Sequence, residues 1–142
     1  MNEPRRYRFT RAQRLQHKRE FEAVYAAKAR AESWPLLVQA VPAIGGRSRL
    51  GLSIGRRLGN AVRRNRMKRL LRESFRLEQA EFPAAYDVIV STKPHDELPL
   101  DEYRRLLRDA LTKLDRLWTK RRQRNQAAPP DPPGDQASSP EA

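Results

Sequence analysis

The chain has 142 residues, with 30 lysines and arginines against 17 acidic residues, a formal net charge of +13 and no cysteine. This length suits one small domain, the charge indicates a polyanionic partner, and the lack of cysteine excludes disulfides and thiolate metal sites. The sequence shows no long apolar run, signal peptide or lipidation motif, so we expect a cytoplasmic protein that binds nucleic acid rather than a membrane.

The N-terminal third is predicted to begin with a basic arm, residues 1–14, in which aromatic residues stand between arginines. A helix is expected from about Lys18 to Ala29, because apolar side chains recur there at helical spacing. Two strands follow at residues 36–41 and 49–54, around a glycine turn. In the second strand, large apolar residues alternate with glycine and serine, so one face packs inward and the other is nearly bare of side chains.

The most informative stretch is RRLGNAVRRNRMKRLLRESFR, residues 56–76, which holds nine basic residues against one acid, Glu73. On a helical wheel, the apolar side chains of this stretch fall on one arc and the basic ones on the other. Surface helices normally mix charge signs, so this helix is predicted to dock on the core with one face and to bind phosphates with the other. Gly59 and Asn60 are predicted to form the turn and cap that begin the helix, and Asn65 a hydrogen bond that fixes its start.

After the basic helix, residues 86–92 are typical of a buried strand, and Asp101 is predicted to cap a long amphipathic helix with a basic end. Residues 125–142 are rich in proline and lack large apolar side chains, so they are expected to form a disordered acidic tail after a folded domain at 15–124. This order of elements predicts an α+β fold with a small central mixed sheet and three helices, in the order α-β-β(-β)-α-β-α.

Three segments carry a resemblance to a known family: LGLSI at residues 50–54, GNAV at 59–62 and RNRMKR at 64–69. With further matches on either side, they resemble the protein subunit of bacterial ribonuclease P over roughly residues 10–120. The resemblance implies that a catalytic RNA removes the 5′ leader of precursor tRNA, while the protein helps it to bind substrate and Mg²⁺, which is held mainly by RNA. It also implies a left-handed crossover at the basic helix, against the usual right-handed rule.

The resemblance assigns two groups of site residues. Aromatic residues at Phe21 and Tyr25 would line a cleft for the single-stranded leader, with Gln39 and Ser53 on its floor, because unpaired bases stack on aromatic faces. Many relatives have an aromatic or larger residue near Gln39, so base stacking is not expected there. Without the resemblance, the aromatic pair would be interpreted as two core residues. The residues expected to bind the catalytic RNA are Arg56, Arg57, Arg63, Arg64, Asn65, Arg66, Lys68, Arg69 and Arg72.

The protein itself is not expected to be the catalyst or to bind a metal, because its acids are scattered and its two histidines lie on different elements. The expected partners are therefore the catalytic RNA and precursor tRNA. The alternative is a basic ribosomal or RNA-chaperone protein that binds structured RNA without a role in cleavage and needs no aromatic cleft. A DNA-binding helix-turn-helix protein is disfavoured, because strands rather than a helix flank the basic helix.

Overall fold

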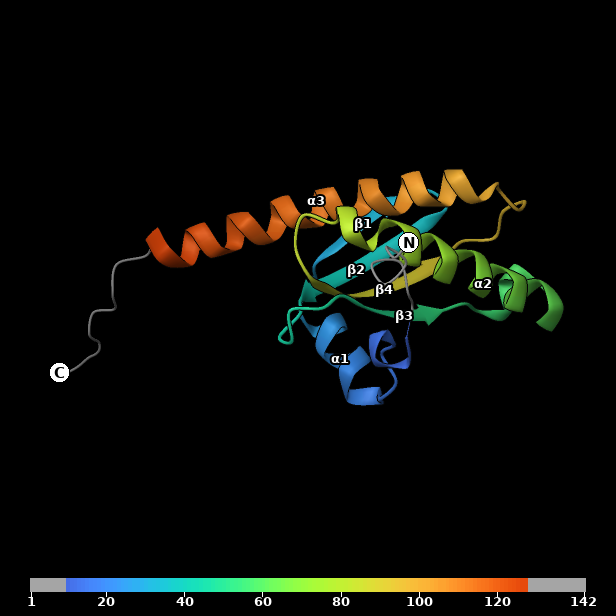
Figure 1. The fold of residues 1–142 in the computed structure, drawn as a ribbon, viewed down its shortest axis with the longest axis horizontal. Coiled ribbons are helices and arrows are strands. Elements are labelled where there is room, and N and C mark those ends of the chain that lie inside the picture. Colours follow the sequence, from blue (N-terminus) through green and yellow to red (C-terminus); the bar gives the residue numbers. More distant parts are fainter. Residues whose placement is uncertain (1–9, 128–142) are drawn as a thin grey trace, which may run out of the picture.

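The structure, a computed structural model, describes residues 10–127, and Figure 1 shows a sheet with helices on both of its faces. Its strands are β1 (Arg30–Ser33), β2 (Leu36–Pro42), β3 (Arg49–Ser53) and β4 (Tyr86–Thr92), in the spatial order β1-β2-β4-β3. β4 pairs antiparallel with β2 and parallel with β3, so the predicted mixed sheet and α+β class are confirmed. Residues 1–9 of the expected arm and residues 128–142 of the expected tail lie outside the described part of the chain.

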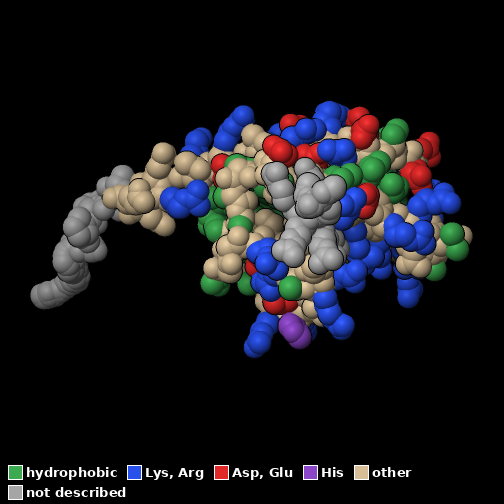
Figure 2. Space-filling model, viewed as in Figure 1, with side chains coloured by type: hydrophobic (Ala, Val, Ile, Leu, Met, Phe, Trp, Pro, Cys, Tyr) green, Lys and Arg blue, Asp and Glu red, His purple; other side chains and the backbone are tan. Residues whose placement is uncertain are grey.

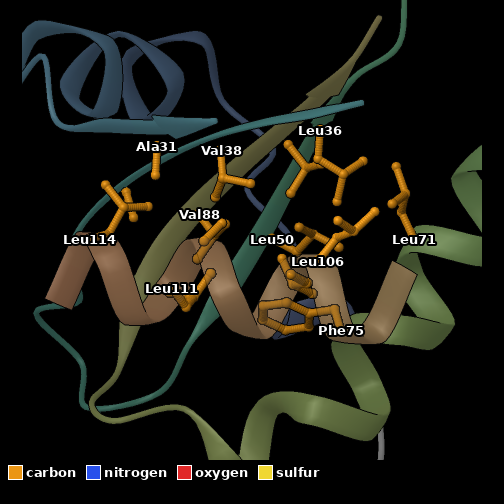
Figure 3. Close-up of a cluster of buried hydrophobic side chains, with 14 of the residues drawn as sticks. Ala31, Leu36, Val38, Leu50, Leu71, Phe75, Val88, Leu106, Leu111 and Leu114 are labelled. Atoms are coloured by element: carbon orange, nitrogen blue, oxygen red, sulfur yellow. The ribbon is translucent and has the colours of Figure 1, made fainter. Parts of the chain in front are cut away.

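The main core lies between one face of the sheet and two helices, α2 (Ala61–Glu78) and α3 (Leu100–Ala127). Figure 3 shows the side chains of the sheet meeting those of the helices there. This arrangement follows from the alternation of the strands and the apolar faces of both helices. The buried residues include Leu36, Val38, Leu50 and Val88 from the sheet, Leu71 and Phe75 from α2, and Leu106, Leu111 and Leu114 from α3.

The start of α2 is fixed by local interactions. Asn60 Oδ1 accepts a hydrogen bond of 2.9 Å from the backbone N–H of Arg63. Gly59 has a φ of 144°, which L side chains rarely adopt, and a Cβ there would lie 2.8 Å from Arg63 Cδ. The predicted turn and cap are therefore confirmed. Asn65 is exposed on the helix, and the cap is supplied by Asn60, so the expected role of Asn65 in fixing the helix start is wrong.

The start of α3 differs from the prediction. The helix begins at Leu100, and the backbone N–H groups of Glu102 and Tyr103 donate to the carbonyl of Pro99 at 3.0 and 3.3 Å. Asp101 therefore lies within the first turn, 3.7 Å from Arg104, and is not the cap. The carboxylate still has a favourable position there, because the helix dipole stabilises negative charge in the first turn.

Both boundaries of the folded domain lie further out than predicted. Gln13 is buried, and its side-chain amide donates to the carbonyl of Ser48 at 3.4 Å. The backbone N–H of Leu15 donates to the carbonyl of Leu50 at 3.0 Å, which joins the N-terminal segment to β3. Residues 10–14 thus belong to the fold rather than to the arm, and α3 continues past residue 124 to Ala127.

The first helix, α1 (Lys18–Ala26), covers the other face of the sheet and is shorter than predicted. Glu20 anchors its start, because one carboxylate oxygen accepts from the backbone N–H groups of Gln16 and His17 at 2.9 and 3.0 Å. The other oxygen accepts from Arg49 of β3 at 2.9 Å, and Arg49 also forms two hydrogen bonds to Asp87 of β4. One arginine therefore links α1 to two strands.

Candidate nucleic-acid interface

The sheet face that carries α1 is only partly covered. On this face Gly51, Ile89 and Gln39 form one row across β3, β4 and β2, and Ser53, Ser91 and Leu37 form the next row. Ile89 packs in a small cluster with Leu15 of the N-terminal segment and Val24 of α1. In the next row Ser53 is exposed, while Ser91 and Leu37 are half-buried. We call this row the open strip.

The glycine face of β3 is less bare than the sequence suggested. The ring of Phe21 lies on Gly51, so closely that a Cβ there would be 2.7 Å from the ring. Gly51 is needed for this close approach, and the aromatic ring takes the place of the missing side chain. The unoccupied part of the face is therefore the open strip beyond Phe21.

The two aromatic residues of α1 lie together but differ in their surroundings. The rings of Phe21 and Tyr25 have centroids 6.5 Å apart and planes tilted by 49°. Phe21 is half-buried against the cluster of Leu15 and Ile89, whereas the side chain of Tyr25 is 40% exposed. Phe21 thus packs on the sheet and is only partly exposed, whereas Tyr25 is more accessible to solvent.

The aromatic and basic regions meet at the edge of the sheet. A cavity of about 150 Å³ is lined by Phe21 of α1, by Lys68 and Arg72 of α2, and by Arg14 and residues 50–52 of β3. β3 is an edge strand, and within residues 10–127 only the segment at Arg14 pairs with its outer side. The structure therefore brings Phe21 of one predicted group together with Lys68 and Arg72 of the other, which the sequence could place only on separate elements.

The exposed side of α2 carries a dense group of cations, and Figure 2 shows lysine and arginine side chains gathered over this helix. A depression of about 590 Å³ along it is lined mainly by arginines from α2 and by Arg14. Burial, and then the charge of Arg14, lowers the pKa of Arg72 below its usual range. Positive charges held this close together repel one another, so the binding of a polyanion that neutralises them is favourable. The arginines of the depression are Arg14, Arg66, Arg69, Arg72 and Arg76.

The cations of this surface differ in their protein contacts. Arg76 donates to Glu73 at 3.0 Å, and Arg66 lies 3.6 Å from Glu97. Arg63 donates to the carbonyl of His95. Arg64 is half-buried with an Nε that has no hydrogen-bond partner in the described structure. Arg56 and Arg57 are exposed on a short 3₁₀ helix before α2.

The predicted site residues thus fall into one continuous surface with two parts. The RNA-binding candidates occupy α2 and the turn before it, while Phe21, Tyr25, Gln39 and Ser53 lie on or beside the open strip. The sequence assigned Arg14 to the basic arm. In the structure it lines both the cavity at the edge of β3 and the depression along α2. Its position could not be predicted, because it depends on the pairing of Leu15 with Leu50.

The histidines do not form a catalytic pair. His95 is half-buried, with Nε2 2.6 Å from the hydroxyl of Tyr103 and Nδ1 2.7 Å from the carbonyl of Lys93, while His17 is exposed before α1. In the described structure no three histidine or acidic residues lie together as a metal site would require. None of the helices between residues 10 and 127 has the length and apolar character needed to cross a membrane.

Comparison with known proteins gives a consistent result. The ribonuclease P protein component of Desulfovibrio desulfuricans is 36% identical over 115 residues, which are 80% of this chain and 88% of that protein. The corresponding protein of Exiguobacterium is 37% identical over 107 residues, or 75% and 93% of the two chains.

Solved structures show the same similarity in three dimensions. The RNase P protein of Staphylococcus aureus matches with a TM-score of 0.62 and 27% identity, over 72% of this chain and 94% of that one. The RNase P protein of Thermotoga maritima matches with the same TM-score and identity, over 72% and 96%. A family model described as ribonuclease P covers residues 9–115, and the chain therefore belongs to the protein-component family of bacterial ribonuclease P.

Proposed function

We propose that this chain binds the catalytic RNA of ribonuclease P through α2 and the 5′ leader of precursor tRNA along the open strip. The observation that carries the proposal is the cavity at the edge of β3, which Phe21 shares with Lys68 and Arg72. A surface for phosphates therefore continues directly into a surface for unpaired bases. A general binder of structured RNA has no need of the second surface.

The cations of α2 would reduce the repulsion between two RNA molecules that must approach each other. Arginine dominates this helix, and its planar guanidinium group can donate two hydrogen bonds to one phosphate. The binding free energy gained from phosphates is independent of base sequence. This suits a protein that must act on many different precursor tRNAs.

The open strip would hold the leader by stacking and hydrogen bonding. Bases stacked on aromatic side chains contribute about 1–3 kcal/mol each, with little dependence on base identity. Tyr25 offers the more exposed ring, while Gln39 and Ser53 offer polar groups on the floor. A leader held there is extended across the strands rather than paired with another RNA strand.

Magnesium is expected in the assembled holoenzyme. The described residues contain no cluster of histidine and acidic side chains that fits a protein-held ion, so we propose that Mg²⁺ is held mainly by RNA. The part of the protein is then to hold the substrate and to lower the electrostatic cost of bringing two RNAs together.

Reconstitution tests this function. The protein is combined with the catalytic RNA encoded in the same genome, and cleavage of precursor tRNA is measured at low Mg²⁺, where the RNA alone is slow. We expect the protein to accelerate formation of the mature 5′ end. If it binds the catalytic RNA and unrelated structured RNAs equally well and cleavage does not change, the RNA-chaperone alternative is correct.

A further inference from the structure

One exposed aromatic residue lies outside the surfaces described above. Trp34 occupies the tight turn between β1 and β2, and 61% of its surface is exposed. Large aromatic side chains usually bury most of their surface, because their transfer out of water is strongly favourable. A tryptophan left this accessible on a small domain requires an explanation.

The turn that carries Trp34 lies beyond the open strip along the strands, on the side away from Phe21 and Tyr25. On β2 the open strip contains Leu37, and Pro35 stands two residues further along, or about 7 Å at the rise of a strand. The carbonyl of Pro35 accepts from the backbone N–H of Lys93, two residues beyond Ser91 of the open strip on β4. The open strip is therefore bounded by Phe21 and Tyr25 on one side and by the turn of Trp34 on the other.

The indole of Trp34 is held by a fixed neighbour. Its ring lies 6.2 Å from the ring of His95, with the planes at 68° in an edge-to-face arrangement. His95 in turn contacts the hydroxyl of the fully buried Tyr103, which also accepts from the backbone N–H of Leu98 at 3.1 Å. A ring positioned in this way loses little conformational entropy when a ligand stacks on it.

Charged side chains lie near the turn that carries Trp34. Arg63 of the first turn of α2 donates to the carbonyl of His95. Lys93, directly after β4, forms an ion pair with Glu32 of β1 beside the turn. A protein partner would need a wider apolar patch around the indole, whereas a nucleotide needs one flat face for its base and a cation for its phosphate.

We propose that Trp34 is a stacking site for an unpaired nucleotide of the precursor leader, on the side of the open strip opposite Phe21 and Tyr25. This proposal rests on the proposed function and adds a third aromatic surface to it. Gln39 lies in the neighbouring row with Ile89 and supplies an amide rather than a ring there. A leader long enough to cross the open strip would reach Trp34, and a short one would not.

The first test compares leader lengths. Affinity of the reconstituted holoenzyme is measured for precursor tRNAs with leaders of about eight and about two nucleotides, since single-strand sites span several nucleotides. Trp34→Leu should weaken binding of the long-leader precursor by about fivefold or more and leave the short-leader precursor unchanged. Trp34→Phe keeps a flat aromatic face and should restore most of the lost affinity.

The matched control is Ile44, which is fully exposed in the turn between β2 and β3, at the opposite end of the sheet. Ile44→Ser removes an exposed apolar side chain without touching the open strip, and we expect unchanged binding of both precursors. Thermal unfolding of Trp34→Leu should match that of the unsubstituted protein, because the indole is mainly in solvent.

Tryptophan fluorescence gives a second measurement. The chain has two tryptophans, and Trp118 is partly buried with its indole N–H donating to the carbonyl of Ala40 at 2.8 Å. The long-leader precursor should shield the emission of the exposed indole from acrylamide, and this shielding should disappear in Trp34→Leu.

The outcomes separate the two proposals. If Trp34→Leu binds both precursors normally while loss of the aromatic rings of α1 still reduces leader binding, Trp34 is not a leader contact and the proposed function stands. If neither substitution changes the discrimination between long and short leaders, the open strip does not bind the leader at all.

Discussion

Glu20 shows how a single acidic side chain can fix the position of α1 on the sheet. Its carboxylate accepts from two backbone N–H groups at the start of α1 and from Arg49 of β3. The hydrogen bonds from His17 and Gln16, with a smaller effect of Arg49, lower the pKa of Glu20 to about 2. Because α1 carries Phe21 and Tyr25, these bonds also fix the aromatic pair over the sheet.

Glu20→Gln should therefore reduce stability in a pH-dependent way. A carboxylate with a lowered pKa stabilises the fold above its unfolded pKa of roughly 4.5, and this stabilisation is lost as the pH falls towards the folded value. At pH 7 we expect the substitution to lower the free energy of unfolding by about 1–2 kcal/mol. Denaturant unfolding should show the difference narrowing between pH 4.5 and pH 2.

The control is Glu22 on the same helix. Its carboxylate is exposed and forms a loose ion pair with Lys18 at 3.9 Å. Glu22→Gln should change the free energy of unfolding by less than about 0.5 kcal/mol. A difference between Glu20→Gln and the unsubstituted protein that stays constant over the acid range would contradict the role of the carboxylate.

The aromatic pair gives a prediction on leader binding. Replacing both Phe21 and Tyr25 by leucine keeps apolar volume but removes the flat rings. Affinity for precursor tRNA should fall, while mature tRNA, which lacks the leader, should bind as before. Tyr25→Leu alone should have little effect on stability, whereas Phe21 also packs on Gly51, so Phe21→Leu should cost about 1 kcal/mol. Equal weakening of precursor and mature tRNA would mean that both rings are structural.

At the scale of elements, α2 has an apolar face in the core and a cationic face in solvent. Leu71 is 1% exposed in the main core, whereas the side chain of Arg66 is 62% exposed. Arg66→Ala combined with Arg69→Ala should weaken binding of the catalytic RNA without lowering the thermal unfolding temperature. Leu71→Ala should instead cost about 2–5 kcal/mol of stability, because it leaves a cavity in the core.

A control for net charge is available on other elements. Arg47 and Arg116 are exposed in the turn before β3 and on α3. Replacing both with alanine removes the same charge as the substitutions on α2, and we expect a much smaller loss of RNA affinity. If the two double variants lost affinity equally, α2 would have no special place in the interface.

The sequence predicted the elements whose signals are local. α2 begins where Gly59 and Asn60 predicted, because a positive φ and a side-chain cap depend on neighbouring residues alone. The sequence allowed for one more strand but did not locate β1, since its four residues RAES include just one apolar side chain and its pairing with β2 fixes its conformation. The prediction that Asp101 caps α3 was wrong, because the carbonyl of Pro99 accepts the first hydrogen bonds of the helix.

The sequence could name the candidate residues of the interface but not how they lie together. Charge asymmetry identified α2, and the family resemblance identified the aromatic pair. The meeting of Phe21 with Lys68 and Arg72 at one cavity depends on Arg14 and on β3 being an edge strand, and both are consequences of tertiary structure. Trp34 had no sequence pattern to mark it, because its exposure is known only from the packing of the turn. The left-handed crossover stays a prediction from the family.

For the whole molecule, the net charge of +13 predicts a strong effect of salt on RNA binding. Each neutralised phosphate releases condensed counterions, so the logarithm of affinity falls linearly with the logarithm of salt concentration. With about six phosphate contacts, affinity for the catalytic RNA should fall roughly a thousandfold between about 50 and 200 mM salt. Binding that barely changed over this range would exclude phosphates as the main contacts.

The order of the strands has a consequence for synthesis of the chain. β4 is the last strand in sequence, yet it lies between β2 and β3. Until residue 92 has left the ribosome, the β1–β2 hairpin and β3 have no strand to join them, and α2 is already complete with its cations. The nascent protein thus contains the cationic segment of α2 before the strand that completes the sheet, so RNA that reaches this segment early would meet a partly folded partner.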